Sequence, residues 1–369
     1  MNGRLEARSV YVVVPGDLDD AANPSGGNTY DRRVCRGLPS TGWRVHELAV
    51  GGAWPRPDAA ARASLARTLA TLPDGAVALL DGLVACGVPD VVVPQAHRLR
   101  LVVLVHLPLG DESGSAPARA AELARLERET LHAVSAVVAT SPWSAQRLVD
   151  HHELGADRVH VAAPGVDPAP PSSGSGGAGR LLCVGAVTAT KGHDLLVEAL
   201  AGVADLPWSC ELVGPLRRDP GQVAAVRAAI ERHRLGARVR LAGPLVGAQL
   251  AAAYDTADLL VLPSRAEAYG MVVTEALARG IPTLAAAVGG VPETLGHDRD
   301  GCVPGILVPP GDVAALADAL RRWFDEPAWR QALRRSALQR RDTLHGWEVT
   351  SACLAGILER LPVLPLRAS

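Results

Sequence analysis

The hydrophobic positions of the chain are gathered in short runs of Val, Leu and Ile, and longer segments with helical spacing separate these runs. Runs without polar interruption are typical of strands buried on both faces of a parallel sheet, and their alternation with helices indicates an α/β fold. In the first half the pattern predicts strands at Val10–Val14, Val77–Leu80, Val91–Val93, Leu101–Val105 and Ala136–Ala139, and helices over Asp58–Leu72 and Pro117–Ala133. In the second half it predicts strands at Leu181–Val184, Ser209–Leu212, Val239–Leu241, Leu259–Leu262, Thr283–Ala286 and Gly305–Val308, and helices over Leu195–Ala201, Gly221–His233, Ala248–Tyr254, Val272–Ala278 and Val313–Trp323.

Between the two series lies a stretch with few core-forming residues, Pro168–Gly179, which reads PAPPSSGSGGAG. Its content of Pro, Ser and Gly predicts a flexible linker at 168–179 that builds no packed element. A chain of 369 residues suits two domains of ordinary size. We therefore expect α/β domains at residues 1–167 and 180–346, and a last helix at about 347–369 that packs back on the first domain.

Composition and charge disfavour several classes of protein for this chain. The formal net charge of −2 does not suit a nucleic-acid binder that relies on electrostatic attraction. No run reaches the roughly twenty apolar residues that span a bilayer, and the first apolar run leads into a glycine turn, so we expect a cytoplasmic protein. No basic amphipathic helix stands out, which disfavours contact with a membrane without excluding it. The six cysteines are scattered, and no His or Cys group has metal-ligand spacing, which predicts buried thiols and no metal site.

A glycine turn follows the first predicted strand, at Ser25-Gly26-Gly27-Asn28, before a helix that should begin near Tyr30. Bare glycines there let backbone N–H groups approach a phosphate at the start of a helix. The segment is not G-x-G-x-x-G, which disfavours a dinucleotide-binding dehydrogenase. A plain turn without a ligand is an equal alternative for this segment.

Lys191 is the only lysine in a chain whose other basic residues are arginines and histidines. It follows the strand end Val184-Gly185 and precedes Gly192 at the start of a predicted helix. Ligands of open α/β sheets bind at the carboxyl ends of the strands, so Lys191 could reach a diphosphate there. A site that needs a compact ammonium instead of a planar guanidinium would explain the exception; the alternative is one ordinary surface lysine.

A segment of mixed character, Glu267-Ala268-Tyr269-Gly270-Met271, joins the strand that ends at Leu262 to a helix that should start close to Gly270. The first N–H groups of that helix can receive a phosphate. Glu275 lies about one turn further on, and carboxylates at these two positions can accept hydrogen bonds from sugar and ribose hydroxyls. The alternatives are a charge favoured by the helix dipole for Glu267 and a solvated helix residue for Glu275.

Two polar residues end strands of the first half. His106 follows the strand that ends at Val105, and Asp81 follows the strand that ends at Leu80. Both should lie at the ligand-binding edge of the first sheet, where Asp81 could contact an acceptor. A hydrogen-bonded histidine without chemistry is an equal alternative for His106.

Taken together, these residues resemble the retaining family-4 glycosyltransferases of the GT-B fold, and the resemblance covers most of the chain. In the second half the matching segments are Val184-Gly185, Lys191-Gly192, Val239–Leu245, Pro263–Met271, Glu275–Pro282 and Gly289–Glu293. In the first half they are Gly26-Gly27, His106, Thr140-Ser141 and Pro164–Asp167. The E-x7-E pair of the family falls on Glu267 and Glu275.

The resemblance implies two Rossmann-like domains with the active site in the cleft between them. It makes His106, Lys191 and Glu267 the expected catalytic residues: Lys191 would neutralise the donor diphosphate, Glu267 would bind sugar hydroxyls, and His106 would hydrogen-bond the donor sugar near the reacting carbon. Glu275 would bind the ribose. The remaining expected contacts are Gly26, Gly27, Leu245, Ala268, Tyr269, Gly270, Met271 and Val272 for the donor, and Asn28 and Asp81 for the acceptor.

One departure from the family concerns the donor diphosphate. The family commonly has an arginine just after the strand glycine, where this chain has Ala186. The diphosphate would therefore lack one expected cation. Candidates for partial compensation are Thr188, Thr190, Arg32 and Arg33.

The expected function is transfer of a hexose from a nucleoside-diphosphate sugar to a hydroxyl or amine of a small-molecule acceptor, with retention at the anomeric carbon. A UDP-sugar is the first expectation for the donor and a GDP-sugar the second, and neither a cofactor nor a metal ion is expected. A nucleotide-sugar epimerase on the same fold and a non-catalytic nucleotide-sugar-binding protein remain as alternatives. The sequence indicates neither the acceptor nor the oligomeric state.

Overall fold

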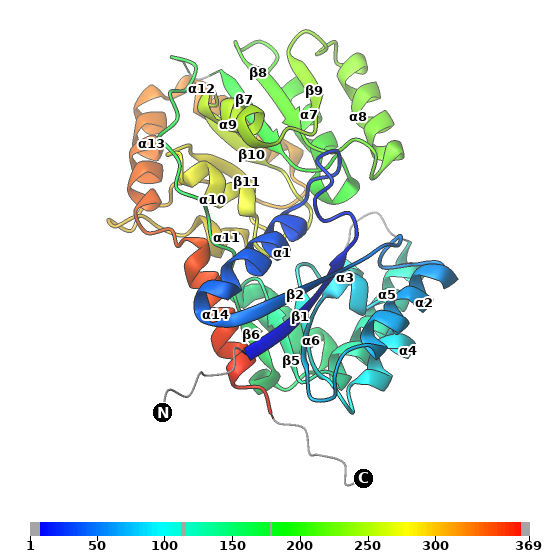
Figure 1. Cartoon of the computed structure of the whole chain (residues 1–369). Helices are drawn as coiled ribbons and strands as arrows, with labels where there is room; N and C mark the ends of the chain where they lie inside the picture. The colour runs from blue at the N-terminus through cyan, green and yellow to red at the C-terminus, as the bar shows by residue number, and fades with distance from the viewer. Residues whose placement is uncertain (1–7, 112–115, 178, 363–369) are drawn as a thin grey trace. The chain divides into compact units, whose positions relative to one another are not determined.

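The computed structural model describes residues 8–111, 116–177 and 179–362 of the chain (Figure 1). They form two compact units. The first comprises the chain up to Asp19, Gly26–Gly165 and the segment that begins at Trp347, and the second comprises Asp20–Ser25 and Val166–Gly346. Each unit has its own six-stranded sheet, and the paired strands run parallel. The expected fold class, two Rossmann-like domains, is confirmed.

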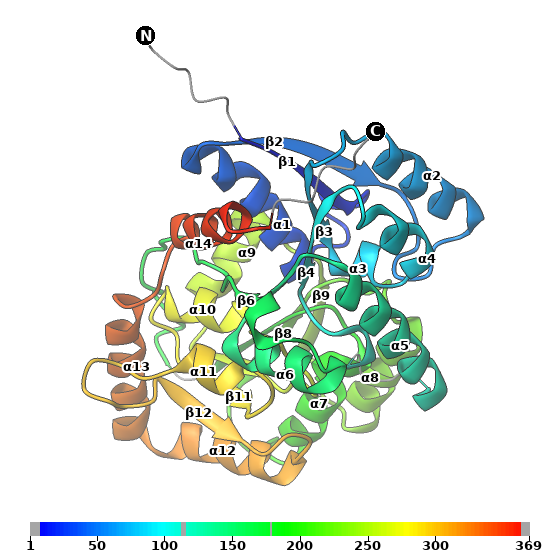
Figure 2. The ribbon, with the colours of Figure 1, turned by 90° about the horizontal axis from the view of Figure 1, so that it is seen from below.

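The sheet of the first unit has the strand order β2-β1-β3-β4-β5-β6. Its strands are β1 (Arg8–Pro15), β2 (Trp43–Val50), β3 (Val77–Asp81), β4 (Arg100–Val105), β5 (Ala136–Ala139) and β6 (Val159–Val161). The helices are α1 (Gly26–Gly37), α2 (Ala59–Ala70), α3 (Gly82–Ala85), α4 (Pro89–Val92), α5 (Pro117–Ala133), α6 (Pro142–His152) and α14 (Trp347–Glu359). Successive side chains of β1 point to opposite faces, so Val12 packs with α1 and α14, while Val13 packs with α2, α4 and α5. Figure 2 shows these two helical layers on either side of the sheet.

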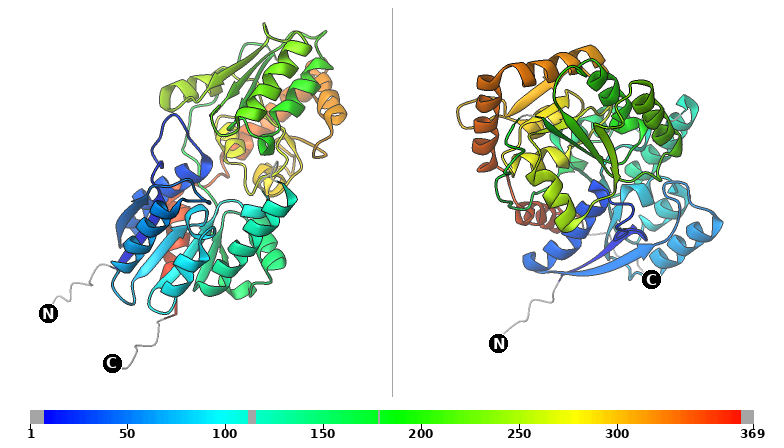
Figure 3. Two further views of the ribbon diagram at one scale, coloured as in Figure 1. Left: turned by 90° about the vertical axis from the view of Figure 1, so that its right-hand side faces the viewer. Right: turned by 90° about the horizontal axis from the view of Figure 1, so that it is seen from above.

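The sheet of the second unit has the order β12-β11-β10-β7-β8-β9. Its strands are β7 (Arg180–Val184), β8 (Ser209–Val213), β9 (Val239–Gly243), β10 (Leu259–Leu262), β11 (Thr283–Ala286) and β12 (Gly305–Val308). The helices are α7 (His193–Ala201), α8 (Pro220–Arg232), α9 (Gly247–Asp255), α10 (Met271–Leu277), α11 (Val291–Leu295), α12 (Val313–Asp325) and α13 (Pro327–Arg341). Leu181 packs with α7, α8 and α12 on one face, whereas Leu182 packs with α9 and α10 on the other. Figure 3 (left) shows α7 and α8 side by side over the first of these faces.

The sequence pattern is wrong at one element and misses several others. Val91–Val93 is helical instead of extended, because Pro89 opens α4 and Pro94 lies in the 3-10 turn that follows, where a proline cannot donate to a sheet. Val92 is still fully buried, so hydrophobicity alone could not separate the two structures. The strand β2 was missed because it is an edge strand with polar residues between its buried ends. The pattern also gave no sign of β6, α6, α11 and α13.

The segment 168–179 contains neither helix nor strand where it is described, but it is not the free linker that its composition predicts. Ser172 is buried, its N–H donates to the Arg279 carbonyl, and its hydroxyl donates to the carbonyl of Asp255. The hydroxyl of Ser175 donates to the Asp258 carboxylate. Small polar side chains thus fasten this segment to the second unit, because each one finds a carbonyl or carboxylate within reach.

The last helix, α14, belongs to the first unit and lies beside α1 (Figure 1). The ring of Trp347 meets that of Tyr30 edge to face at 5.7 Å, and the Thr350 hydroxyl donates to the Ala163 carbonyl at 2.8 Å. Leu354 and Ile357 are buried in the core with β1. The helix ends at Glu359, so the expectation of a helix over about 347–369 is wrong for residues 360–362, and residues 363–369 lie outside the described residues.

Arginine side chains satisfy carbonyl groups at the carboxyl ends of several helices. Arg98 donates to the Leu69 and Leu72 carbonyls at the end of α2, and Arg158 donates to those of Leu131, His132 and Val134 at the end of α5. Arg238 donates to the carbonyls of Ala204, Leu206 and Trp208 in the loop between α7 and β8. A planar guanidinium with five donors can serve two or three carbonyls that a helix leaves without partners.

Two expectations from composition can be checked. All six cysteines are free, but Cys302 and Cys353 are exposed, so the expectation of buried thiols is wrong for these two. Among the described residues, no helix has both the length and the apolar character needed to cross a bilayer.

Candidate functional site

The single lysine of the chain lies at the carboxyl edge of the second sheet. β7 ends at Val184, and the loop after it closes with the 3-10 turn Ala189–Lys191 before α7 begins. Lys191 Nζ lies 2.6 Å from Oε1 of Glu267, and the Lys191 side chain is 31% exposed. Ser264 Oγ donates to the same carboxylate oxygen at 2.8 Å. The structure thus brings together two residues that the sequence singled out separately.

Gly192 lets the two loops approach closely enough for this ion pair. Its φ is +66°, and a Cβ at this position would lie 2.2 Å from the carbonyl oxygen of Pro263, just after β10. Arg265 ties the same loops together: its N–H donates to the Thr190 carbonyl at 2.7 Å, and its guanidinium pairs with Asp194 at 2.6 Å. Lys191 is therefore positioned by backbone contacts and a second ion pair, as well as by Glu267.

Glu267 is buried on the loop before α10, with 7% of its surface exposed. Its carbonyl accepts from Gly290 N–H at 3.1 Å, and a Cβ on Gly289, where φ is +57°, would lie 1.7 Å from that carbonyl oxygen. Its carboxylate interacts with Lys191 and Ser264. This environment differs from that of an exposed charge at a helix start.

The residues after Glu267 lead into α10. Gly270, with φ of +87°, precedes the helix, and no side chain of the described structure caps its first turn. Ala268 is buried, and burial raises the pKa of Tyr269 to about 12. Leu245 and Val272 pack against one hydrophobic cluster beside Tyr254. That these groups and Met271 contact a donor stays a prediction.

Glu275 is not a solvated helix residue. Its side chain is buried enough to raise the pKa of the carboxyl above its ordinary value. Oε2 accepts a hydrogen bond from the Tyr254 hydroxyl at 2.7 Å. The guanidinium of Arg279 lies 4.6 Å from the centre of the Tyr254 ring and also donates to the Glu275 carbonyl. This network fixes the Glu275 carboxylate at one place beside β10 and α9.

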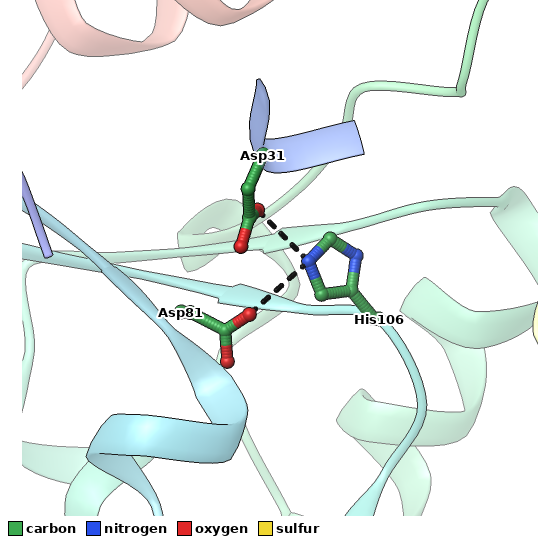
Figure 4. Close-up of side chains that lie close together, drawn as sticks. All are labelled: Asp31, Asp81 and His106. Atoms are coloured by element: carbon green, nitrogen blue, oxygen red, sulfur yellow. Dashed lines mark hydrogen bonds and ion pairs between the residues drawn. The ribbon is translucent and has the colours of Figure 1, made fainter. Parts of the chain in front are cut away.

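His106 lies at the carboxyl edge of the first sheet, directly after β4. Its Nε2 is 2.9 Å from Oδ1 of Asp31 and 3.4 Å from Oδ2 of Asp81 (Figure 4). Burial alone would lower the pKa of His106, but these two carboxylates raise it to about 10. The two carboxylates therefore favour the protonated form of the ring.

Asp81 caps the turn α3, since its carboxylate accepts from the N–H groups of Leu83 and Val84. Burial alone would raise its pKa, but the contact with His106 and the hydrogen bond from the Leu83 N–H hold it below its ordinary value. The carboxylate is 4% exposed and engaged by neighbours. Contact of Asp81 with an acceptor stays a prediction.

Asp31 is a member of this group that the sequence analysis missed. It is 2% exposed and comes from α1. Burial raises its pKa, and the nearby Asp81 carboxylate raises it further, while His106 acts in the opposite direction. A signal was available: Asp31 follows Gly27 by four residues, so both lie on one face of a helix that starts at the glycine turn.

Gly27 has a steric role that a plain turn would not need. A Cβ at this position would lie 3.1 Å from Cδ2 of the His106 ring. Asn28 donates from Nδ2 to the Asp17 carbonyl at 3.3 Å. The helix α1 begins at Gly26, which is earlier than the expected start near Tyr30.

The two arginines considered as substitutes for the missing cation at Ala186 are engaged within the first unit. Arg32 pairs with Asp19 and Glu47, both at 2.5 Å. The guanidinium of Arg33 lies 5.9 Å from the centre of the Trp347 ring. Thr190 is buried. Lys191 is therefore the cation that this structure places at the carboxyl edge of the second sheet beside Glu267.

Asp31, Asp81 and His106 also form the one group in the described residues whose carboxylate and imidazole atoms lie close enough to hold a metal ion, within 4.8 Å of one another. Both carboxylates approach Nε2 of His106, which is the arrangement expected when the proton on Nε2 is hydrogen-bonded to both of them. A metal ion would have to replace these contacts. The geometry fits an ion-paired imidazolium better than a ligand set.

Two family profiles together match residues 24–340 of the chain. "Glycosyltransferase Family 4" matches residues 24–170, and "Glycosyl transferases group 1" matches residues 171–340. The chain belongs to the family-4 glycosyltransferases.

Among curated relatives of this glycosyltransferase, "D-inositol 3-phosphate glycosyltransferase 1" of Catenulispora acidiphila is 36% identical over 69% of this chain and 62% of its own length. The D-inositol 3-phosphate glycosyltransferase of Streptosporangium roseum is 32% identical over 75% of this chain and 67% of its own length. The chain thus spans less than two thirds of the first of these relatives.

Solved structures of other proteins share the fold of this glycosyltransferase. Sucrose-phosphate synthase of Thermosynechococcus elongatus superposes with a TM-score of 0.78 at 22% identity, covering 96% of this chain and 98% of that one. Anabaena HepE, solved in complex with UDP-glucose, superposes with a TM-score of 0.76 at 17% identity, covering 96% of this chain and all of that one. At these identities the likeness establishes the GT-B architecture alone.

Proposed function

We propose that this glycosyltransferase moves a hexose from a nucleoside-diphosphate sugar to a hydroxyl or amine of a small-molecule acceptor, with retention at the anomeric carbon and without a metal ion. The observation that carries the proposal is the pairing of Lys191 with Glu267 at the carboxyl edge of the second sheet. An ammonium beside the start of α10 can stabilise a departing diphosphate. A buried carboxylate next to it can bind sugar hydroxyls.

The donor is proposed to be a UDP-sugar, with GDP-sugars as the second choice. HepE was solved with UDP-glucose and with UDP, which supports testing uridine nucleotides first. For the acceptor, the names of the curated relatives make inositol phosphates the first compounds to test. In this proposal His106 acts at the donor sugar and Glu275 at the ribose.

The test is a donor screen followed by an acceptor screen. Thermal shift with UDP-, GDP-, ADP- and TDP-sugars identifies the nucleotide, and release of nucleoside diphosphate is then measured over a panel of polyols, inositol phosphates and amines. We expect one nucleotide class to stabilise the protein, and product that depends on acceptor and persists in excess EDTA. Stabilisation by no nucleotide sugar would overturn the proposal. Loss of activity in EDTA that Mg²⁺ or Mn²⁺ restores would overturn its metal-independent part.

A nucleotide-sugar epimerase is the second candidate. The observation that favours it is the group of Asp31, Asp81 and His106, since an epimerase needs acid–base residues around the sugar ring. Such an enzyme would convert its sugar at one ring carbon without any acceptor. Proton NMR of each stabilising UDP-sugar, incubated with the protein alone, separates the two: new ring couplings without release of UDP would favour the epimerase.

A further inference from the structure

The imidazole of His106 is held from several sides within the first unit. Asp31 and Asp81 meet its Nε2 at 2.9 and 3.4 Å, and both are almost fully buried. The ring of Tyr30 meets it edge to face, with centroids 5.3 Å apart, and the backbone of Gly27 lies against its Cδ2 edge. Asp31, Asp81 and Tyr30 are the titratable side chains that contact the ring among the described residues. These contacts leave the ring one orientation.

The second ring nitrogen faces away from this group. Figure 4 shows Nδ1 on the edge of the ring turned away from both carboxylates. No side chain or backbone group of the described structure hydrogen-bonds to it, whereas Nε2 has two partners. The His106 side chain keeps 20% of its surface exposed. Nδ1 is thus the polar atom of this ring that a ligand can use.

Two carboxylates at Nε2 also decide where the protons lie. A lone pair on Nε2 would be repelled by both oxygens, so Nε2 either carries a proton or accepts one from Asp31. An imidazolium has a proton on each nitrogen, and a neutral ring that accepts at Nε2 must carry its proton on Nδ1. The form with a basic Nδ1, neutral and protonated at Nε2 only, is disfavoured because the carboxylates stabilise the cation.

We propose that Asp31 is a positioning residue of the transfer reaction: together with Asp81 it holds Nε2 of His106, so that the ring offers an Nδ1–H donor and does not serve as a base. The identity of the acceptor of that hydrogen bond, the reacting sugar, rests on the proposed function. The pairing itself rests only on the first unit. The proposal explains why Gly27 and Asp31 lie on one face of α1, since the first makes room for the ring and the second holds it.

The direct test is the titration of His106 by NMR in protein with labelled histidines, where the signal is identified by its loss in His106→Gln. In the wild-type chain we expect the ring to stay protonated from pH 6 to 9. In Asp31→Asn the remaining carboxylate is the more distant one, and we expect the midpoint to fall by roughly one to three pH units. A wild-type ring that titrates near its ordinary value, or an unchanged midpoint in Asp31→Asn, would overturn the proposal.

The matched control is Glu127→Gln. Glu127 and His152 form another buried carboxylate–imidazole pair in the first unit, at 3.0 Å, and Glu127 also accepts from the Leu109 N–H, which a glutamine oxygen can still do. We expect this variant to leave the His106 titration unchanged. If Asp31→Asn does not fold, the wild-type titration alone still decides, and Asp81→Asn should give a smaller shift.

The second readout is the pH dependence of kcat/KM with the donor found above. Between pH 7 and 9 we expect a nearly flat profile for the wild-type chain, and for Asp31→Asn a fall that approaches tenfold per pH unit above the lowered midpoint. Parallel profiles would mean a merely structural role and would overturn the proposal. If no nucleotide sugar is used at all, the proposed function fails, but the NMR titration still tests the pairing of Asp31 with His106.

Discussion

Lysine and arginine have different tasks in this molecule. Arginine side chains each satisfy two or three carbonyls at helix ends or in loops, which a planar group with several donors does well. The one lysine pairs with the buried Glu267. The residue after it is Gly192, where a side chain would collide with the Pro263 carbonyl. We expect the compact ammonium of Lys191 to contact a phosphate oxygen of the donor as well as Glu267. The residue choice thus follows the geometry that each position requires.

Removal of the Lys191 ammonium should weaken use of the donor. We expect Lys191→Ala to lower kcat/KM for the donor by about 2–3 kcal/mol, or roughly 30- to 160-fold, as for the loss of a charge-assisted contact to a phosphate. Lys191→Arg is the control for charge, and it should not restore activity fully because a planar fork does not fit the place of an ammonium. Wild-type turnover of Lys191→Ala at limiting donor would contradict the assignment.

The sequence singled out some residues of the candidate sites and missed others. Lys191 and Glu267 could be singled out because each follows a strand end in the sequence, and Glu275 because the family resemblance pairs it with Glu267. Asp31 could not be found from strand ends, because it lies within a helix and becomes significant only through a residue 75 positions away. The partners Tyr254 and Ser264 depend in the same way on contacts that only the fold creates.

At the level of elements, continuous hydrophobic runs predicted the central strands well. Most of β3, β4 and β5 is buried on both faces, so their sequences contain few polar residues. The edge strand β2 faces solvent at several positions and therefore lacks this signal. The segment Val91–Val93 has the hydrophobicity of a strand but the prolines of a turn, and the prolines decide its structure.

The loops after β7 and β10 depend on Gly192 for their close approach. We expect Gly192→Ala to destabilise the chain by about 2–5 kcal/mol, since it adds strain at positive φ to a clash with the Pro263 carbonyl. Gly311→Ala is the matched control: φ there is +75°, but a Cβ meets no atom within 4 Å. It should cost only about 1–2 kcal/mol. The two variants are compared by thermal unfolding, and equal losses would show that the close approach contributes nothing.

At the level of the whole molecule, the two-domain fold could be predicted because each half repeats the same alternation of buried strands and helices. The segment between them could not, since its composition indicates flexibility while its serines find partners on the second unit. The composition of a segment indicates whether it can form a helix or a strand by itself. It does not indicate which hydrogen-bond partners the neighbouring domain provides.

The complete reaction allows a stereochemical test. We expect an α-linked donor to give an α-linked product. An inverting enzyme needs a free base on the face opposite the leaving group, and His106 is unsuited to this because its two carboxylate partners favour its protonated form. Proton NMR of the first-formed product gives the coupling at the anomeric carbon. A β-linked product from an α-linked gluco-configured donor would contradict retention and would make His106 and Asp81 candidates for a base and its partner.

Because Lys191 is the only lysine of the chain, amine-directed reagents have almost no side chain to modify. Apart from the N-terminal amine, a reagent that acylates amines finds one side chain in 369 residues, and it lies 2.6 Å from Glu267. Labelling at that position is therefore site-specific without mutagenesis. A ligand that covers Lys191 would shield it, so the extent of labelling in a mass spectrum measures occupancy of this one site, for donors and inhibitors alike.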